Sequence, residues 1–317
     1  MNISGGKLVH CLSFDVEEHF QVSAFESPVR RSKWGQFESR IHKNTDKILG
    51  LLASRQVRAT FFVLGWVAER YPEIVRSIAA EGHEVASHGY GHELITSQTP
   101  VNFRDDIRKA KIILEGILGQ PVYGYRAPSF SITRDTVWAL PILVEEGYVY
   151  DSSLFPILHD RYGMREANPI CHRLETTAGP LWELPPSTIS ILGIRFPVAG
   201  GGYFRLLPYT ILRNFLIRLE QMGQPLVMYL HPWEFDVDQP RMEGSLLSRF
   251  RHYINLDKTE GRLKRLLSDF SFAPICEAIR PIAEMCRKNP ESLLVGKQEP
   301  KCHAPVSYSD THLSLPR

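Results

Sequence analysis

Cysteine is scarce in this sequence, and no two cysteines are closely spaced. The residues Cys11, Cys171, Cys276, Cys286 and Cys302 are scattered over 317 positions, and none forms a Cys-x-x-Cys pair. This pattern argues against a disulfide framework and against a cysteine-based zinc site. It is typical of a protein from a reducing compartment.

Long apolar runs and a strong charge imbalance are also missing. No stretch of about 18 apolar residues occurs, and the first ten residues lack the basic start and apolar core of a signal peptide. The formal net charge of +2 gives no reason to expect a nucleic-acid partner. We therefore expect a cytoplasmic protein without a transmembrane segment, with action at the inner membrane face left open.

The sequence instead contains a regular alternation of apolar strands and amphipathic helices. This repetition predicts an α/β protein with a parallel sheet, either open or closed into a barrel. Strands are expected at 7–14, 59–64, 84–87, 122–126, 148–151, 181–184 and 225–230, and helices at 45–54, 71–81, 103–118, 136–146, 209–222 and 249–270.

Polar side chains follow the predicted strands at their carboxyl ends. In parallel α/β folds these ends converge on one face, which carries the active site. His88 and His92 are four positions apart in a glycine-rich turn, where they can bind one metal ion. Asp15 and Glu17 point to the same side, so one can bind the metal while the other accepts a proton. The full set is Asp15, Glu17, His88, His92, Arg126, Asp151 and His231.

Five motifs in this order resemble the polysaccharide deacetylases of the chitin and peptidoglycan deacetylase superfamily. They are Ser13-Phe-Asp15-Val-Glu17, Ser87-His88-Gly-Tyr-Gly-His92, Arg126-Ala-Pro-Ser129, Asp151-Ser-Ser-Leu-Phe-Pro156 and Tyr229-Leu230-His231-Pro232. Further segments resemble the branch found with exopolysaccharide and exosortase (PEP-CTERM) loci. These segments are Glu183-Leu-Pro-Pro-Ser-Thr188, Ala199-Gly-Gly-Gly-Tyr-Phe-Arg205 and His231-Pro-Trp-Glu234.

The resemblance implies a distorted (β/α) barrel, usually of seven strands, and a divalent metal, commonly zinc. By position, Glu17, His88 and His92 would bind the metal and Asp15 would be the general base. Glu17 replaces the family's aspartate, so either carboxylate can be the true ligand. Arg126 would pair with Asp15, and Asp151 would orient His231 as the general acid. Leu230 would line the acetyl pocket, and the N–H of Ser129 would help to stabilise the oxyanion.

Several other residues are candidates for substrate contact. Trp182, Tyr203 and Trp233 can stack on sugar rings, although core packing is an alternative role for each. Glycines 200–202 suggest a flexible loop or a bend. Glu234 and Asp236 are expected in a solvated acidic loop. Glu234 is also a candidate to bind and orient an active-site residue without contacting the metal itself.

These observations predict residues 1–275 as a catalytic barrel with C-terminal extension helices, and residues 276–317 as a disordered tail. The expected function is metal-dependent removal of N-acetyl groups from an exopolysaccharide or its lipid-linked precursor. The partner would be an N-acetylated polysaccharide or lipid-linked oligosaccharide, and a homo-oligomer is allowed. The alternatives are an allantoinase-like small-molecule amidohydrolase and a non-catalytic carbohydrate-binding scaffold.

Overall fold

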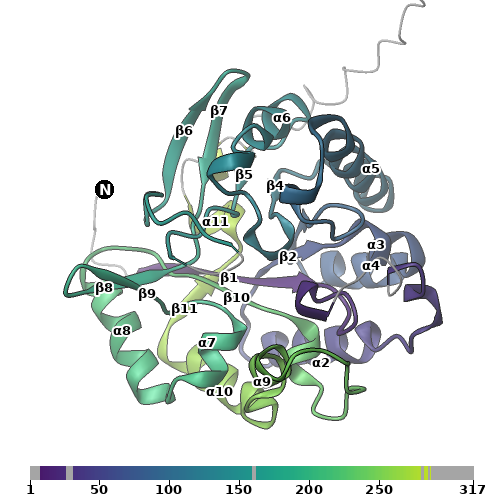
Figure 1. Ribbon diagram of the computed structural model, residues 1–317. Helices are drawn as coiled ribbons and strands as arrows, with labels where there is room; N and C mark the ends of the chain where they lie inside the picture. Colours follow the sequence, from purple (N-terminus) through teal and green to yellow (C-terminus); the bar gives the residue numbers. More distant parts are fainter. Residues whose placement is uncertain (1–7, 26–30, 159–161, 280–281, 285, 287–317) are drawn as a thin grey trace, which may run out of the picture.

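A curved, mainly parallel sheet forms the centre of the molecule (Figure 1). The computed structural model describes residues 8–25, 31–158, 162–279, 282–284 and 286. Neighbouring strands pair in parallel in the order β10-β1-β2-β3-β4-β5-β7. Their bounds are β1 Val9–Val16, β2 Thr60–Val63, β3 Glu84–Ser87, β4 Gly124–Tyr125, β5 Tyr150–Asp151, β7 Gly179–Glu183 and β10 Val227–Leu230. The predicted α/β class is confirmed.

The two edges of this strand series meet at Ser187. Its backbone N–H donates to the carbonyl oxygen of Val227 at 3.2 Å, and the N–H of Val227 donates to the Ser187 hydroxyl at 2.8 Å. A regular barrel would be closed by a strand ladder at this point, whereas here two hydrogen bonds join the edges. This arrangement agrees with the expected distorted barrel. Strand β6 (His172–Thr176) extends β7 in antiparallel fashion, and β11 (Ser271–Ala273) pairs with the start of β1.

Helices surround the strands on the outside (Figure 1). Leu12, Phe14 and Val16 of β1 face this helical layer and belong to the main core, because successive strand residues alternate between the two sides of a sheet. The helices are α2 Ile41–Ala53, α3 Gly65–Arg70, α4 Pro72–Ala80, α5 Pro100–Leu118, α6 Ala139–Glu145, α7 Gly201–Leu206, α8 Tyr209–Gln221, α9 Leu246–Tyr253, α10 Leu256–Asp269 and α11 Ile275–Ala278.

Smaller elements complete the fold. The single helix predicted over 249–270 is in fact two helices, because Asn255 adopts a left-handed conformation with φ of 51° between α9 and α10. A two-stranded sheet consists of β8 (Thr188–Ile191) and β9 (Ile194–Pro197). The 3-10 helices are η1 Ser23–Phe25, η2 Trp34–Gln36, η3 Ile95–Ser97, η4 Pro128–Phe130, η5 Arg134–Thr136 and η6 Pro232–Phe235.

The inner side of the strands has its own apolar cluster. Cys11 and Phe62 point inward and pack with Ile275, Ile279 and Ile282. The expected boundary of the tail at residue 276 is therefore wrong, because Ile279 and Ile282 lie beyond it and are buried in this cluster. Residues 287–317 of the expected tail lie outside the described part of the chain. Within the described ranges, the helices are all too short or too polar to cross a membrane.

Candidate metal centre and active site

A tight turn after β3 brings His88 and His92 together. Gly89 and His92 have φ values of 72° and 51°, which are left-handed conformations that reverse the chain direction. Asp106 of α5 stabilises the turn, because its carboxylate accepts the N–H groups of Tyr90 and Gly91 at 2.7 and 2.9 Å. As a result, the centroids of the two imidazole rings lie 5.3 Å apart.

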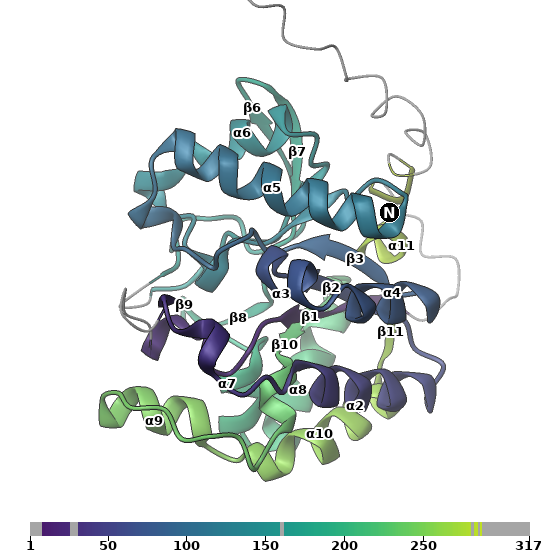
Figure 2. The ribbon, with the colours of Figure 1, turned by 90° about the vertical axis from the view of Figure 1, so that its right-hand side faces the viewer.

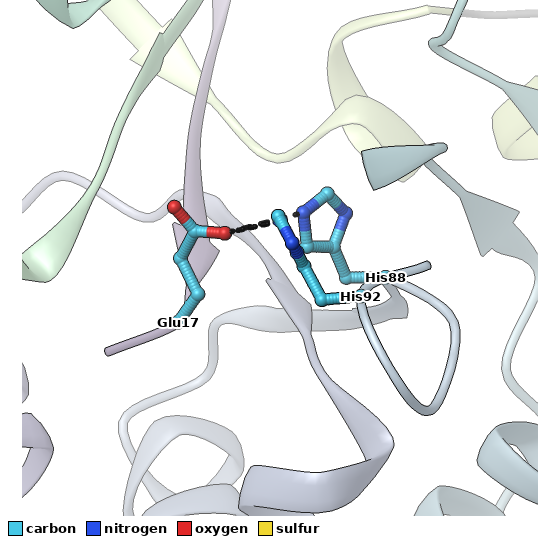
Figure 3. Close-up of side chains that lie close together, drawn as sticks. All are labelled: Glu17, His88 and His92. Atoms are coloured by element: carbon cyan, nitrogen blue, oxygen red, sulfur yellow. Dashed lines mark ion pairs between the residues drawn. The ribbon is translucent and has the colours of Figure 1, made fainter. Parts of the chain in front are cut away.

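Glu17 approaches both histidines from the end of β1 (Figure 3). Its Oε2 atom is 2.5 Å from Nε2 of His92 and 4.0 Å from Nε2 of His88. Trp233 orients the carboxylate by donating its indole N–H to Oε1 at 3.1 Å. One ligand atom from each of Glu17, His88 and His92 lies within 4.8 Å of the others, and all three residues are buried.

The chemistry of this cluster fits a divalent cation. Nδ1 of His88 lies 2.8 Å from the carbonyl oxygen of Arg126, so the N–H on Nδ1 leaves the lone pair of Nε2 directed at the cluster. Burial lowers the pKa of His88 to about 4, which keeps the imidazole neutral. Burial opposes the charged form of Glu17, but the imidazoles of His92, His231 and His88 outweigh this effect and hold its pKa below the usual range. Two imidazoles and a carboxylate are typical zinc ligands.

Asp15 is paired with Arg126, and it shares the imidazole of His231 with Glu17, whose Oε1 atom is 3.8 Å from Nε2 of His231. The Oδ1 atom of Asp15 accepts a hydrogen bond from Arg126 at 2.6 Å, so the expected Asp15–Arg126 pair is present. The guanidinium is fully buried and also donates to the hydroxyl groups of Ser13 and Ser152. Oδ2 of Asp15 lies 3.9 Å from Nε2 of His231. Asp15 thus lies between a buried cation and an imidazole, beside the cluster formed by Glu17.

His231 is paired with Glu234 rather than with Asp151. Nδ1 of His231 lies 2.6 Å from Oε1 of Glu234, and Arg205 donates to the other carboxylate oxygen at 2.7 Å. Burial disfavours the charged imidazole, but the hydrogen bond to Glu234 and the charges of Glu17, Glu234 and Asp15 outweigh it and raise the pKa of His231 to about 9. His231 therefore holds a proton on this side of the pocket.

The expected pairing of Asp151 with His231 is wrong. Its Oδ1 atom accepts from Ser153 at 2.5 Å, and its buried neighbour Glu183 accepts the N–H of Leu154 at 3.0 Å. Burial raises the pKa of Asp151 to about 6 and that of Glu183 well above its usual range. Asp151 thus belongs to a carboxyl pair between β5 and β7, and among the described contacts its carboxylate does not meet His231.

The expected acidic loop after His231 is also wrong, because Glu234 and Asp236 are buried. The glycines at 200–202 explain where the Glu234 carboxylate lies. They begin helix α7 instead of forming a loop, and a Cβ atom on Gly201 would come within 1.8 Å of the Glu234 carboxylate. Sequence reasoning did not link these two segments, although both lay within the motifs that it singled out.

A pocket of about 450 Å³ opens over these groups. Of the five predicted substrate-binding residues, Ser129, Tyr203 and Trp233 line it. Leu230 faces the helical layer, because its neighbours Tyr229 and His231, the latter just beyond the end of β10, both point inward and line the pocket. Trp182 packs against the inner apolar cluster. The expectations for Leu230 and Trp182 are therefore wrong.

Comparison with known proteins agrees with this geometry. Residues 30–143 match the polysaccharide deacetylase family model. This segment of the chain is similar to polysaccharide deacetylases. Residues 152–280 match a domain of unknown function (DUF3473). His88, His92 and Arg126 fall in the first region, and Arg205, His231 and Glu234 fall in the second, so the two regions build one site.

Curated relatives match over a limited stretch of this chain. A peptidoglycan-N-acetylglucosamine deacetylase of Bacillus cereus is 38% identical over 96 residues, which are 30% of this chain and 35% of that protein. A chitooligosaccharide deacetylase of Bradyrhizobium sp. is 33% identical over 94 residues, which are 29% of this chain and 43% of that protein. The chain thus spans less than half the length of these relatives.

Solved structures share the fold over nearly the whole length. A Mycobacterium smegmatis protein assigned as a polysaccharide deacetylase superimposes with a TM-score of 0.59 at 21% identity, covering 99% of this chain and 97% of that one. An allantoinase gives a TM-score of 0.57 at 16% identity, covering 88% of this chain and 91% of the other. The fold alone therefore does not separate the two activities.

Proposed function

We propose that this protein is a metal-dependent hydrolase that removes N-acetyl groups from amino sugars of an exopolysaccharide or its lipid-linked precursor. One observation carries the proposal. Asp15, paired with Arg126, and His231, paired with Glu234, flank the Glu17–His88–His92 cluster inside a single pocket. A base, a cation site and an acid are the three elements that amide hydrolysis requires. The match of residues 30–143 to the polysaccharide deacetylase family model supports the same reaction class.

In this proposal Glu17, His88 and His92 would hold the cation, most simply zinc. When bound, it would polarise the acetyl carbonyl and make a water acidic enough to attack at neutral pH. Oδ2 of Asp15 accepts the proton of the attacking water, while Arg126 stabilises the carboxylate through Oδ1. Nε2 of His231 then donates its proton to the departing nitrogen, so that one water and one amide give acetate and a free amine.

The geometry also bears on which carboxylate binds the cation. Glu17 reaches both histidines, whereas Asp15 is engaged by Arg126. We therefore assign Glu17 to the cation and Asp15 to proton transfer. Ser129, Tyr203 and Trp233 are assigned to the sugar, with Tyr229 replacing Leu230 near the acetyl group. The cytoplasmic location, the link to exosortase loci and a homo-oligomeric state stay predictions from the sequence.

The test is acetate release from a panel of N-acetylated amino-sugar oligomers, with bound metal measured by elemental analysis. Asp15→Asn should keep the metal and lose about 10²-fold or more in turnover, because only the base is removed. His88→Ala and Glu17→Gln should lose metal and activity together. Undiminished metal content in His88→Ala would refute the proposed metal ligands. If Asp15→Asn lost the metal and Glu17→Gln kept it, Asp15 would be the metal ligand and Glu17 would be the base. Allantoin hydrolysis without acetate release would favour the amidohydrolase alternative.

A further inference from the structure

Helix α9 presents an exposed apolar face beside the pocket. Leu246, Leu247 and Phe250 are 83%, 55% and 56% exposed. Residues at these spacings lie on one side of an α-helix. The opposite side faces the protein, because His252 is buried and its ring stacks on Trp233 with a centroid distance of 4.1 Å. The apolar side of α9 is therefore turned outward.

The carboxyl end of this helix is tied to the active site. Arg205 donates to the carbonyl oxygens of His252 and Ile254 at 2.8 Å each, and the same guanidinium binds Glu234, the partner of His231. Phe250 both lines the pocket and is exposed, so the apolar face continues into the pocket wall. In Figure 2, α9 lies at the lower left, and α11, which contributes Ile275 to the inner apolar cluster, lies on the right.

Basic side chains accompany the apolar face. Residues 245–253 contain Arg249 and Arg251 and no acidic residue. On a helical projection the two arginines lie on either side of the stripe formed by Leu246, Leu247 and Phe250. An apolar stripe with flanking basic residues is the pattern of helices that lie in a membrane interface, where anionic headgroups attract the basic side chains.

A second copy of the chain fits this face less well. A two-fold contact through α9 would bring the arginines of both copies close together, and like charges repel there. Leu246 and Leu247 do not line the pocket, so contact with a soluble sugar does not account for their exposure. Anionic lipid complements both the charge and the apolar surface.

We propose that α9 docks on an anionic membrane surface and presents the pocket to an amino sugar carried on a lipid. The lipid-linked substrate rests on the proposed deacetylase function, whereas the docking itself does not. The apolar pocket wall at Phe250 and Leu206, which is 48% exposed, would then lie next to the lipid portion of the substrate. The part of the chain that matches the domain of unknown function would thus bring the enzyme to its substrate.

The experiment is co-sedimentation of the full-length protein with vesicles of phosphatidylcholine, with and without phosphatidylglycerol. Leu246→Ser/Leu247→Ser should weaken binding to the phosphatidylglycerol vesicles by roughly tenfold or more, because two inserting side chains are lost. Arg249→Gln should weaken binding about fivefold, and only to the anionic vesicles. The matched control is Val101→Ser/Ile112→Ser on α5, whose side chains are 67% and 64% exposed. It removes two exposed apolar groups elsewhere and should bind like wild type.

Each outcome decides the proposal. Failure of wild type to bind anionic vesicles, or equal binding by the Leu246/Leu247 variant, overturns it. A loss of self-association in that variant with vesicle binding unchanged would make the face a dimer contact instead. Acetate release from a soluble oligomer should be the same in wild type and variant. If neither protein releases acetate from the soluble oligomer or from an N-acetylated amino sugar carried on a lipid in the vesicles, but vesicle binding depends on α9, the deacetylase function fails while the docking stands.

Discussion

Nδ1 of His231 lies 2.6 Å from Oε1 of Glu234, a fully buried carboxylate three residues further along the chain. The same carboxylate accepts the backbone N–H of His231 at 3.0 Å. Arg205 binds its other oxygen, so the carboxylate is fixed on both sides. This arrangement sets both the orientation and the proton affinity of the imidazole proposed as the general acid.

Glu234→Gln should move the alkaline limb of the kcat profile to lower pH. The neutral amide no longer stabilises the imidazolium, so His231 loses its proton at a lower pH than in wild type, where Glu234 helps to raise the pKa to about 9. The measurement is kcat against pH with a soluble N-acetylated oligomer. Asp151→Asn is the control and should leave this limb in place. A shift in Asp151→Asn but not in Glu234→Gln would restore the pairing expected from the sequence.

Asp106→Asn should weaken metal binding, although Asp106 is not a ligand. Its carboxylate accepts two backbone N–H groups in the turn that carries His88 and His92, and an amide can accept through one oxygen only. We expect a loss of about tenfold in metal affinity, measured by competition with a chromophoric chelator. The exposed neighbour Asp105→Asn is the matched control. Equal affinities in the two variants would contradict a positioning role for Asp106.

Gly201→Ala should destabilise the protein, whereas Gly202→Ala should not. A Cβ atom on Gly201 would lie 1.8 Å from the Glu234 carboxylate, while a Cβ atom on Gly202 meets nothing within 4 Å. We expect Gly201→Ala to lower the free energy of unfolding by about 1–3 kcal/mol and to reduce turnover. Gly202→Ala should be neutral or stabilise the helix by about 0.5–1 kcal/mol. Urea denaturation measures both, and equal stability of the two variants would refute the proposed packing.

The sequence predicted the architecture well because strand and helix periodicities are local properties. It located the carboxyl ends of β1, β3, β4, β5 and β10, and the structure places Asp15, Glu17, His88, Arg126 and His231 near one another on that face. The error at Leu230 was avoidable, since an inward His231 requires an inward Tyr229 by strand alternation. The error at the tail was avoidable too. Ile275, Ile279 and Ile282 have helical spacing and are buried.

Partners that come from distant segments could not be read from the sequence. Asp151 ends β5 and Glu234 lies just beyond β10, both are acidic, and only the folded chain shows which carboxylate meets His231. The same holds for Asp106, which lies inside a helix among many charged residues. The exposed face of α9 could not be read from the sequence either, because the helix predicted over 249–270 begins after Leu246 and Leu247, and Asn255 ends α9 where the prediction continues.

The sequence by itself determined the parallel α/β architecture, the family resemblance and the residue types at the candidate site, since these depend on periodicity and on short motifs. The tertiary structure decided how those residues are paired. Glu17 joins the histidines, Asp15 joins Arg126, and Glu234 joins His231. The physical reason is that pairing depends on side-chain direction and on burial. Both are set where segments as far apart as Gly201, Glu234 and His252 pack together.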